Sequence, residues 1–241
     1  MRAVILAGGL GMRLRPYTTI LPKPLVPVGD RPILEHIIRR LAASGVTSID
    51  VCLGHLGELI RVYFSQQDKL PENLELGWHW EDEPLGTAGA LATVPGLDDT
   101  FIAMNGDVLT NLDYRELLEH HRRHGAVLTV ATQCKRVDID LGVIESRDGL
   151  IAGYREKPSL DYQVSMGIYV YEPEALRYLP GGHCQFPDLV LRLLDAGERV
   201  AAYHSEAEWY DIGTFQEYER AMDALALRPA AFSFDDAGVR A

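Results

Sequence analysis

Short apolar runs alternate with segments of helical spacing along the first 137 residues of the chain. The apolar runs predict buried strands, and segments whose apolar residues recur every three or four positions predict helices that bury one face. The expected elements, in chain order, are strand 2–7, helix 32–44, strand 49–53, helix 55–64, strand 74–80, helix 87–93, strand 101–105, helix 113–124 and strand 127–132. This alternation predicts an α/β fold with a mostly parallel sheet and helices on both faces.

The pattern changes after about residue 138. An Asp-Gly pair at 148–149 separates two strand-like runs, 142–145 and 150–155, which is a strong signal for a β-hairpin. The elements expected next are strand 165–171, helix 187–196, strand 199–203 and helix 214–225. We predict one domain over 1–227 whose second part, from about 138 to 227, is the more antiparallel. Residues 228–241 lack periodicity, which predicts a loose tail.

Composition places the chain among soluble globular proteins, because 47% of its 241 residues are hydrophobic and 24% are charged. No stretch approaches the roughly 20 apolar residues of a membrane-spanning helix. The N-terminus reaches glycines too early for a signal peptide. The three cysteines (Cys52, Cys134 and Cys184) form no paired motif, so we expect neither a zinc cluster nor a disulfide framework. These features predict a cytoplasmic protein.

The net charge of −12 argues against nucleic acid or an anionic membrane as partner, since both need a basic surface. The charge is uneven, however. Residues 1–40 hold seven basic and two acidic side chains, a net +5, which leaves −17 on the rest of the chain. A local positive charge on a negative body suits a small anionic ligand.

A glycine-rich segment, residues 7–16, follows the first strand with the sequence Ala-Gly-Gly-Leu-Gly-Met-Arg-Leu-Arg-Pro. Glycines let a backbone approach a ligand closely, and their N–H groups can line an anion site. A Walker loop would need Gly-Lys-Ser/Thr, and a dinucleotide loop would need glycine where Leu14 stands. Arg13 and Arg15 indicate direct neutralisation of phosphate charge. The alternative is an ordinary turn with solvated arginines.

Lys23 lies between two prolines, Pro22 and Pro24. Because proline fixes φ near −65°, we expect the chain to be held extended there and the ammonium to be rigidly presented, as suits a phosphate clamp. The alternative is a proline-rich surface turn.

Taken with these two segments, five later motifs resemble the signature of the sugar-1-phosphate nucleotidyltransferases, the enzymes that make nucleotide-sugars. The motifs are Leu-Gly-Thr-Ala-Gly-Ala-Leu at 85–91, Asn-Gly-Asp at 105–107, Glu-Lys-Pro at 156–158, Gly-Ile-Tyr at 167–169 and Trp-Tyr-Asp-Ile-Gly-Thr at 209–214. They look most similar to mannose-1-phosphate and heptose-1-phosphate guanylyltransferases. The resemblance implies a Rossmann-like mixed sheet, with a nucleotide-binding half over about 1–137 and a smaller antiparallel sugar-binding part over about 138–227.

The reaction implied is attack by a sugar-1-phosphate oxygen on the α-phosphorus of a nucleoside triphosphate, with release of pyrophosphate. Such catalysis is mainly positioning and charge neutralisation, which fits a chain whose eight histidines form no nucleophilic triad. The resemblance assigns Arg13 and Lys23 to the triphosphate and Asp107 and Asp211 to Mg²⁺, whose usual ligands are carboxylate and phosphate oxygens. Asp107 also follows an apolar strand, where ligands bind in open α/β sheets. Read alone, each aspartate suits a turn or a cap.

The resemblance also divides the remaining site residues between the two substrates. The nucleotide positions are Leu6, Gly8, Gly9, Gly11, Arg13, Lys23, Glu83, Gly86 and Thr87. The sugar-phosphate positions are Asn105, Gly142, Glu156, Lys157, Ser165 and Gly167. Lys157 would hold the sugar phosphate and Glu156 the sugar hydroxyls. The catalytic set is Arg13, Lys23 and Asp107.

The sequence specifies the nucleotide base and the sugar less closely than it specifies the reaction. Guanine presents two adjacent donors that one carboxylate can accept, so Glu83 is the expected guanine reader and GTP the expected donor. Family members often carry Asn before Ala-Gly or Gly-Gly, where this chain has Ser165 and Met166. Met166 would add apolar bulk, which points away from plain mannose or glucose toward a heptose, deoxysugar or cyclitol phosphate.

Three alternatives to the guanylyltransferase are considered, and the first two stay open. One is a thymidylyl- or uridylyltransferase acting on glucose-1-phosphate, and another is a non-catalytic, nucleotide-sugar-binding regulatory relative. A nicotinamide oxidoreductase is disfavoured by Leu14. The resemblance implies a stand-alone catalytic domain in nucleotide-sugar and polysaccharide biosynthesis. Its partners are small molecules, with self-association into a homo-oligomer left open.

Overall fold

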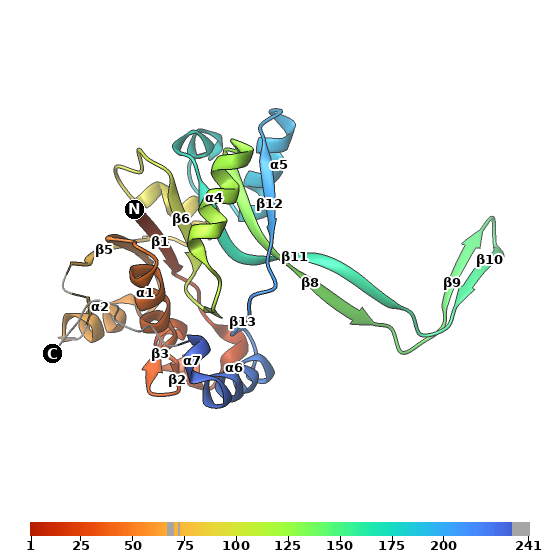
Figure 1. Ribbon diagram of the computed structural model, residues 1–241, viewed down its shortest axis with the longest axis horizontal. Helices are drawn as coiled ribbons and strands as arrows, with labels where there is room; N and C mark the ends of the chain where they lie inside the picture. Colours follow the sequence, from red (N-terminus) through yellow and green to blue (C-terminus); the bar gives the residue numbers. More distant parts are fainter. Residues whose placement is uncertain (67–69, 72, 233–241) are drawn as a thin grey trace.

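The central sheet of the structure, a computed structural model that describes residues 1–66, 70, 71 and 73–232, has seven strands (Figure 1). They are β1 (Arg2–Ala7), β4 (Ser48–Leu53), β5 (Glu75–Trp80), β6 (Phe101–Asn105), β8 (Leu128–Asp138), β11 (Ser159–Tyr171) and β12 (Val200–His204). Their order is β12-β8-β11-β6-β1-β4-β5. Only β11 runs antiparallel to its neighbours in this sheet. The predicted mixed, mostly parallel α/β sheet is confirmed.

Helices cover both faces of the sheet. They are α1 (Ile33–Ala43), α2 (Gly57–Ser65), α3 (Gly86–Gly89), α4 (Tyr114–His124), α5 (Phe186–Asp195), α6 (Phe215–Leu227) and α7 (Pro229–Phe232). Alternate residues of β1 separate two cores, since Ile5 belongs to one core and Val4 to the other. Helices α1, α2, α4 and α6 contribute to the first core, and α3 and α5 to the second. Successive side chains of a strand point to opposite faces, which explains the division.

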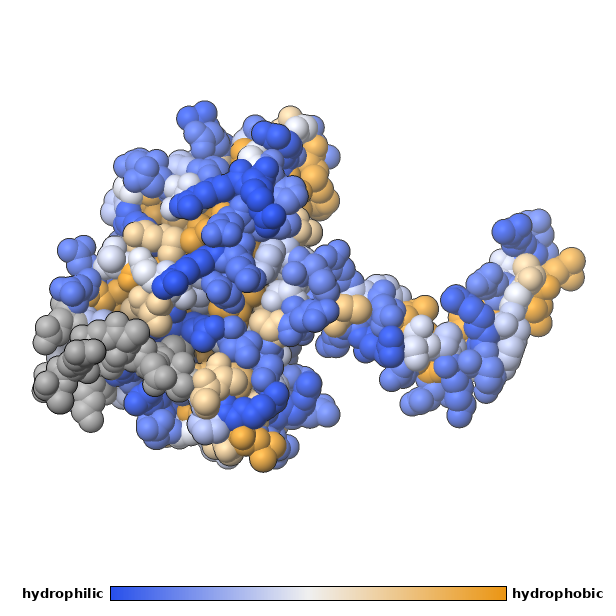
Figure 2. Space-filling model, in the orientation of Figure 1, coloured by the Kyte–Doolittle hydropathy of each residue, from blue (hydrophilic) through white to orange (hydrophobic). Residues whose placement is uncertain are grey.

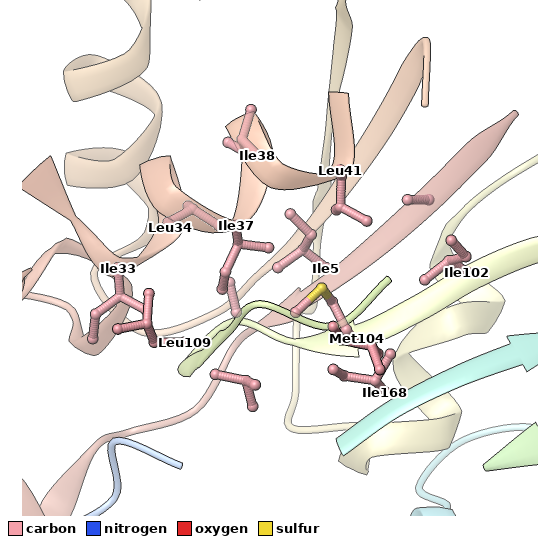
Figure 3. Close-up of a cluster of buried hydrophobic side chains, with 14 of the residues drawn as sticks. Ile5, Ile33, Leu34, Ile37, Ile38, Leu41, Ile102, Met104, Leu109 and Ile168 are labelled. Atoms are coloured by element: carbon pink, nitrogen blue, oxygen red, sulfur yellow. The ribbon is translucent and has the colours of Figure 1, made fainter. Parts of the chain in front are cut away.

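Helix α1 shows how the first core forms. Its apolar residues recur at helical spacing, so that Ile33, Ile37 and Leu41 lie on one face, and all are buried. Figure 3 shows this face packed over Ile5 and Met104 of the central strands. Each such side chain contributes about 1.5–3 kcal/mol when it leaves water.

A second, smaller sheet joins two distant parts of the chain near the carboxyl end of β6. Strand β7 (Val108–Thr110) pairs antiparallel with β13 (Trp209–Asp211), with Asp211 opposite Val108. The Ile212 N–H then donates to the Asp107 carbonyl at 3.0 Å. These strands are too short for a periodic pattern, so the sequence did not predict them. They bring the segments around Asp107 and Asp211 together.

Strands β8 and β11 continue past the sheet as a two-stranded ribbon that projects from the body, and the hairpin of β9 (Val143–Arg147) and β10 (Leu150–Arg155) forms its tip (Figure 1). We call residues 133–164 the arm. The hairpin was predicted, but both long strands extend well beyond the predicted 127–132 and 165–171. Their outer parts are mostly exposed and carry no buried face for a hydropathy pattern to register.

The end of the described chain also differs from its prediction. Residues 229–232 form α7, and Phe232 is only 2% exposed, with its ring centroid 6.2 Å from that of Tyr210. One aromatic residue suffices to anchor this turn, although the segment shows no periodic pattern. The rest of the predicted tail, 233–241, lies outside the described residues. Among the described helices, none has the length and apolar character needed to cross a membrane.

Candidate functional site

A pocket of about 290 Å³ opens where the carboxyl ends of β1 and β6 meet the glycine-rich loop. Ligands bind at this edge in open α/β sheets. Its lining consists of Leu6, Ala7, Gly8, Gly9, Lys23, Pro24, Glu81, Pro84, Gly86, Thr87, Ala90, Asn105, Gly106, Asp107 and Gln185. The predicted nucleotide positions 6, 8, 9, 23, 86 and 87 are therefore together in one cavity, with two predicted residues of the catalytic and sugar sets, 105 and 107.

Two glycines of this lining lie close against other parts of the protein. Gly86 has φ +76°, and a Cβ there would lie 2.6 Å from the carbonyl oxygen of Cys184. At Gly8, a Cβ would collide with the Glu81 carboxylate. These contacts are with the protein itself, so the role of both glycines toward a ligand stays a prediction. Gly11 lies outside the lining and turns the loop instead, with φ +60° and a carbonyl that accepts a hydrogen bond from Thr18 Oγ1 at 2.7 Å.

Lys23 reaches the floor of the pocket and donates a hydrogen bond to Asp107 Oδ2 as part of an ion pair. The expectation that the chain is extended here was wrong, because Lys23–Leu25 forms a 3-10 turn closed by Leu25 N–H and the Pro22 carbonyl at 2.8 Å. Pro24 fits the start of such a turn because it has no N–H to leave unpaired. The lysine is nevertheless firmly placed, with a side chain only 11% exposed.

The two predicted metal ligands are close enough to interact. Burial first, and then the negative charge of Asp107, raises the pKa of Asp211, while Lys23 and Arg13 act in the opposite direction. The Arg13 guanidinium lies beside Gly213, where a Cβ would be 3.1 Å from Nη2. The predicted catalytic residues and both predicted metal ligands thus lie close together, with Lys23 and Asp107 in the pocket lining and Arg13 and Asp211 outside it.

The donor set at this point fits a magnesium ion. Asp107 Oδ1 is buried and has no hydrogen-bond partner, and the same is true of Asn105 Oδ1 in the pocket wall. Burying an unpaired carboxylate oxygen is costly, so these atoms are suited to a bound ligand. Among the described residues no cluster of three or more candidate ligands occurs. Mg²⁺ needs only one or two carboxylates when substrate phosphates supply further oxygens.

The predicted sugar-phosphate residues fall into two separate groups. Ser165 and Gly167 lie beside Asn105: the Gly167 N–H donates to Ser165 Oγ at 3.2 Å, and a Cβ at Gly167 would be 2.6 Å from Asn105 Nδ2. Met166 is fully buried in the core, so the expectation that it adds bulk to a sugar site was wrong. The other group, Gly142, Glu156 and Lys157, lies on the arm and outside the described pocket lining.

The comparisons with known proteins agree with this architecture. Residues 2–227 match the profile of a family described as "Nucleotidyl transferase". The chain belongs to the nucleotidyl transferase family. It is 32% identical over 250 residues to a UTP–glucose-1-phosphate uridylyltransferase of Synechocystis sp., covering 95% of this chain and 64% of that protein. It is 30% identical over 227 residues to a mannose-1-phosphate guanyltransferase of Schizosaccharomyces pombe, covering 90% and 62%. The chain thus spans somewhat less than two thirds of these relatives.

Solved structures of similar proteins share the fold. HddC from Yersinia pseudotuberculosis superposes with a TM-score of 0.72 at 26% identity, over 93% of this chain and 99% of that one. A putative glucose-1-phosphate thymidylyltransferase from Bacillus anthracis gives 0.70 at 25%, over 100% and 98%. This chain therefore has the nucleotidyl transferase fold. Its relatives are named for different nucleotides, so their names do not agree on one base.

Two lining residues of this nucleotidyl transferase were not singled out from the sequence. Glu81, directly after β5, accepts the Leu85 N–H at 2.9 Å, and burial raises the pKa of its carboxyl group. Glu83, the predicted guanine reader, is exposed and is not part of the described lining. Gln185 accepts a hydrogen bond from Thr87 Oγ1 at 3.3 Å. Its position before α5, in a capping box with Asp188, is the signal that could have located it.

Proposed function

We propose that this nucleotidyl transferase joins a nucleoside monophosphate, preferably from GTP, to a sugar-1-phosphate. An oxygen of the sugar phosphate attacks the α-phosphorus of the triphosphate, the bond to the bridging oxygen of the β-phosphate breaks, and pyrophosphate leaves with that electron pair. The observation that carries this proposal is the group of Lys23, Asp107 and Asp211, the first two of which line a pocket that also contains glycines. Cations neutralise the phosphates there while carboxylates provide the metal ligands.

Each side chain has a distinct part in this reaction. Lys23 and Arg13 bind the triphosphate and reduce the repulsion that the incoming phosphate meets, and Lys23 also holds Asp107 in place. Asp107 and Asp211 would hold Mg²⁺, which draws electron density from the phosphate oxygens when bound. No covalent intermediate with the protein is needed, since positioning the two anions supplies most of the catalysis.

The base is assigned through Glu81. Its carboxylate is half-buried in the pocket wall and is fixed by the Leu85 N–H, which leaves acceptor capacity for the N1–H and N2–H₂ donors of guanine. Two similarities support this choice: the guanyltransferase of Schizosaccharomyces pombe, and HddC, which was solved with GMP-PN. Glu81 replaces Glu83 in this role because Glu83 lies outside the described lining.

A second candidate has support of its own. The relative from Synechocystis is a uridylyltransferase and the Bacillus anthracis structure a putative thymidylyltransferase, both named for glucose-1-phosphate. Pyrophosphate release with Mg²⁺ should therefore be measured for GTP, dTTP, UTP and CTP against mannose-, heptose- and glucose-1-phosphate. Preference for GTP supports the proposal, preference for dTTP or UTP favours the second candidate, and nucleotide binding without release would indicate a non-catalytic relative.

A further inference from the structure

The arm carries three of the residues that the sequence motifs assign to the sugar phosphate, at a distance from the pocket proposed for the nucleotide. Gly142, Glu156 and Lys157 flank the β9–β10 hairpin, which lies at the far end of the ribbon from the body (Figures 1 and 2). None of them is in the described lining of the pocket around Asp107. Within one chain the pocket therefore has its predicted nucleotide residues and, of the predicted sugar-phosphate residues, only those around Asn105.

The tip of the arm is itself organised as a polar cluster. The Tyr154 hydroxyl donates to Glu156 Oε2 at 2.7 Å and packs against Gly142, where a Cβ would collide with its oxygen. Lys157 has φ +42°, a left-handed conformation that is strained for a non-glycine residue. Strain of this kind persists where the surroundings fix it and is common at binding sites.

The same tip exposes an apolar surface. Leu150 is 75% exposed, Ile151 71%, and Leu141 75%, and Figure 2 shows apolar side chains at the end of the projection. An isolated two-stranded hairpin is marginally stable in water, and contiguous apolar groups on a projection mark an interaction surface. The tip of the arm thus carries both the predicted sugar-binding residues and exposed apolar residues. This combination suits a tip that packs against a protein surface beside a bound substrate.

We infer that the arm of one copy of this chain completes the sugar-phosphate side of the site in a second copy. Lys157 of each arm neutralises the sugar phosphate, and Glu156 accepts from sugar hydroxyls, over the Asp107 of the other copy. This inference rests on the proposed function. Exchanging identical elements gives a two-fold dimer in which both sites are complete.

The geometry favours a second copy over the chain's own body. The pairing between Thr132–Asp138 and Ser159–Ser165 is unbroken, so the ribbon directs its tip away from its own pocket, and reaching that pocket would require the ribbon to fold back. The pocket of a second copy can receive the tip without any change in the conformation of the ribbon.

Paired inactive variants test the inference. Asp107→Asn disables the body and Lys157→Ala disables the arm, so a hybrid of the two has one intact site if arms are exchanged. Co-expression with two different tags and sequential purification isolates this hybrid. We expect each homogeneous variant to lose at least 10²-fold in pyrophosphate release and the hybrid to regain about half of wild-type activity. A hybrid as inactive as its parents overturns the inference.

A matched pair controls for non-specific rescue. A hybrid of Asp107→Asn with Lys23→Ala carries both defects in the body, so every site stays defective and no activity should return. If the wild-type chain itself releases no pyrophosphate with any substrate pair, the proposed function fails, and this outcome is distinct from an active wild type with an inactive hybrid.

Light scattering on a sizing column tests the interface without using activity. The wild type should elute as a dimer, Ile151→Asp on the arm should shift it toward monomer, and Leu191→Asp, at a residue 59% exposed on α5, should leave it dimeric. A monomeric wild type, or failure of the two tagged chains to purify together, overturns the inference.

Discussion

Lys23 and Asp107 form an ion pair in which the ammonium binds one carboxylate oxygen and the other stays buried without a hydrogen-bond partner. The two residues are 84 positions apart, on the segment after the glycine-rich loop and at the end of β6. The lysine positions the carboxylate, whose unpaired oxygen would hold the metal ion in the proposed function. In the proposed function, this contact would link triphosphate binding to metal binding.

Removal of either partner should abolish turnover while leaving the fold intact. We expect Lys23→Ala and Asp107→Ala each to lower kcat by 10²-fold or more, in the range typical of lost electrostatic stabilisation of a transition state. Arg192→Ala and Asp223→Asn, at residues on the outer surfaces of α5 and α6, should keep near-normal rates. Steady-state kinetics measures kcat for each variant, and circular dichroism checks that each variant is folded. Near-normal turnover in either site variant removes that residue's role.

Glu81 should determine the base. Glu81→Gln replaces a pure acceptor by a group that donates as well, which suits uracil and thymine better than guanine. The ratio of kcat/KM for GTP over UTP should fall by about 10–100-fold, the order expected when a polar site is mismatched. Glu83→Gln is the matched control and should leave the ratio unchanged, because Glu83 lies outside the described lining. If Glu83→Gln lowers the ratio and Glu81→Gln does not, Glu83 is the residue that recognises the base.

The raised pKa of Glu81 also predicts a pH effect on stability. Burial raises this pKa above its value in the unfolded chain, about 4.3, so the folded protein binds the proton more tightly. The ionised carboxylate therefore destabilises the fold above that pH and has no such effect below it. Glu81→Gln should raise the Tm of the ligand-free protein at pH 7, and the gain should vanish as the pH falls to about 4. A gain that persists at pH 4 would contradict the assignment.

Gly86 should tolerate no side chain. Gly86→Ala combines a left-handed backbone with a Cβ 2.6 Å from the Cys184 carbonyl oxygen, and we expect a loss of about 2–4 kcal/mol in the free energy of unfolding. Gly45→Ala separates the two causes, because Gly45 has φ +93° and nothing within 4 Å of a Cβ. It should cost only about 1–2 kcal/mol. Equal losses in urea unfolding would mean that the collision is relieved without cost.

Much of the fold could be predicted because buried strands leave a clear pattern. Strands β1 and β6 have the predicted bounds, since apolar residues fill them up to a glycine or a polar residue. Strands β7 and β13 could not be predicted, because three residues carry no period and their pairing joins segments about 100 positions apart. The arm was only partly predicted, because its exposed ribbon has no buried face.

The sequence motifs predict which residues belong to the candidate site better than they predict where those residues lie in the fold. The motifs located Lys23, Asp107 and the glycines of the pocket, which the structure places together. Three acidic residues follow β5, and a sequence does not reveal which of them turns inward, so Glu83 was expected where Glu81 lies. The motif at 156–158 likewise names Lys157 without revealing that an arm carries it away from its own pocket.

The fate of the α-phosphate shows whether this protein transfers a nucleotide to a sugar. The protein is incubated with Mg²⁺, GTP labelled with ³²P at the α-phosphorus, and the sugar-1-phosphate that gives the most pyrophosphate, and the products are separated by chromatography. We predict that the label enters a nucleotide-sugar in a one-to-one ratio with pyrophosphate, and that Asp107→Ala forms neither. Label that stays in GTP with every sugar-1-phosphate, or that appears as GMP without a sugar, would contradict it.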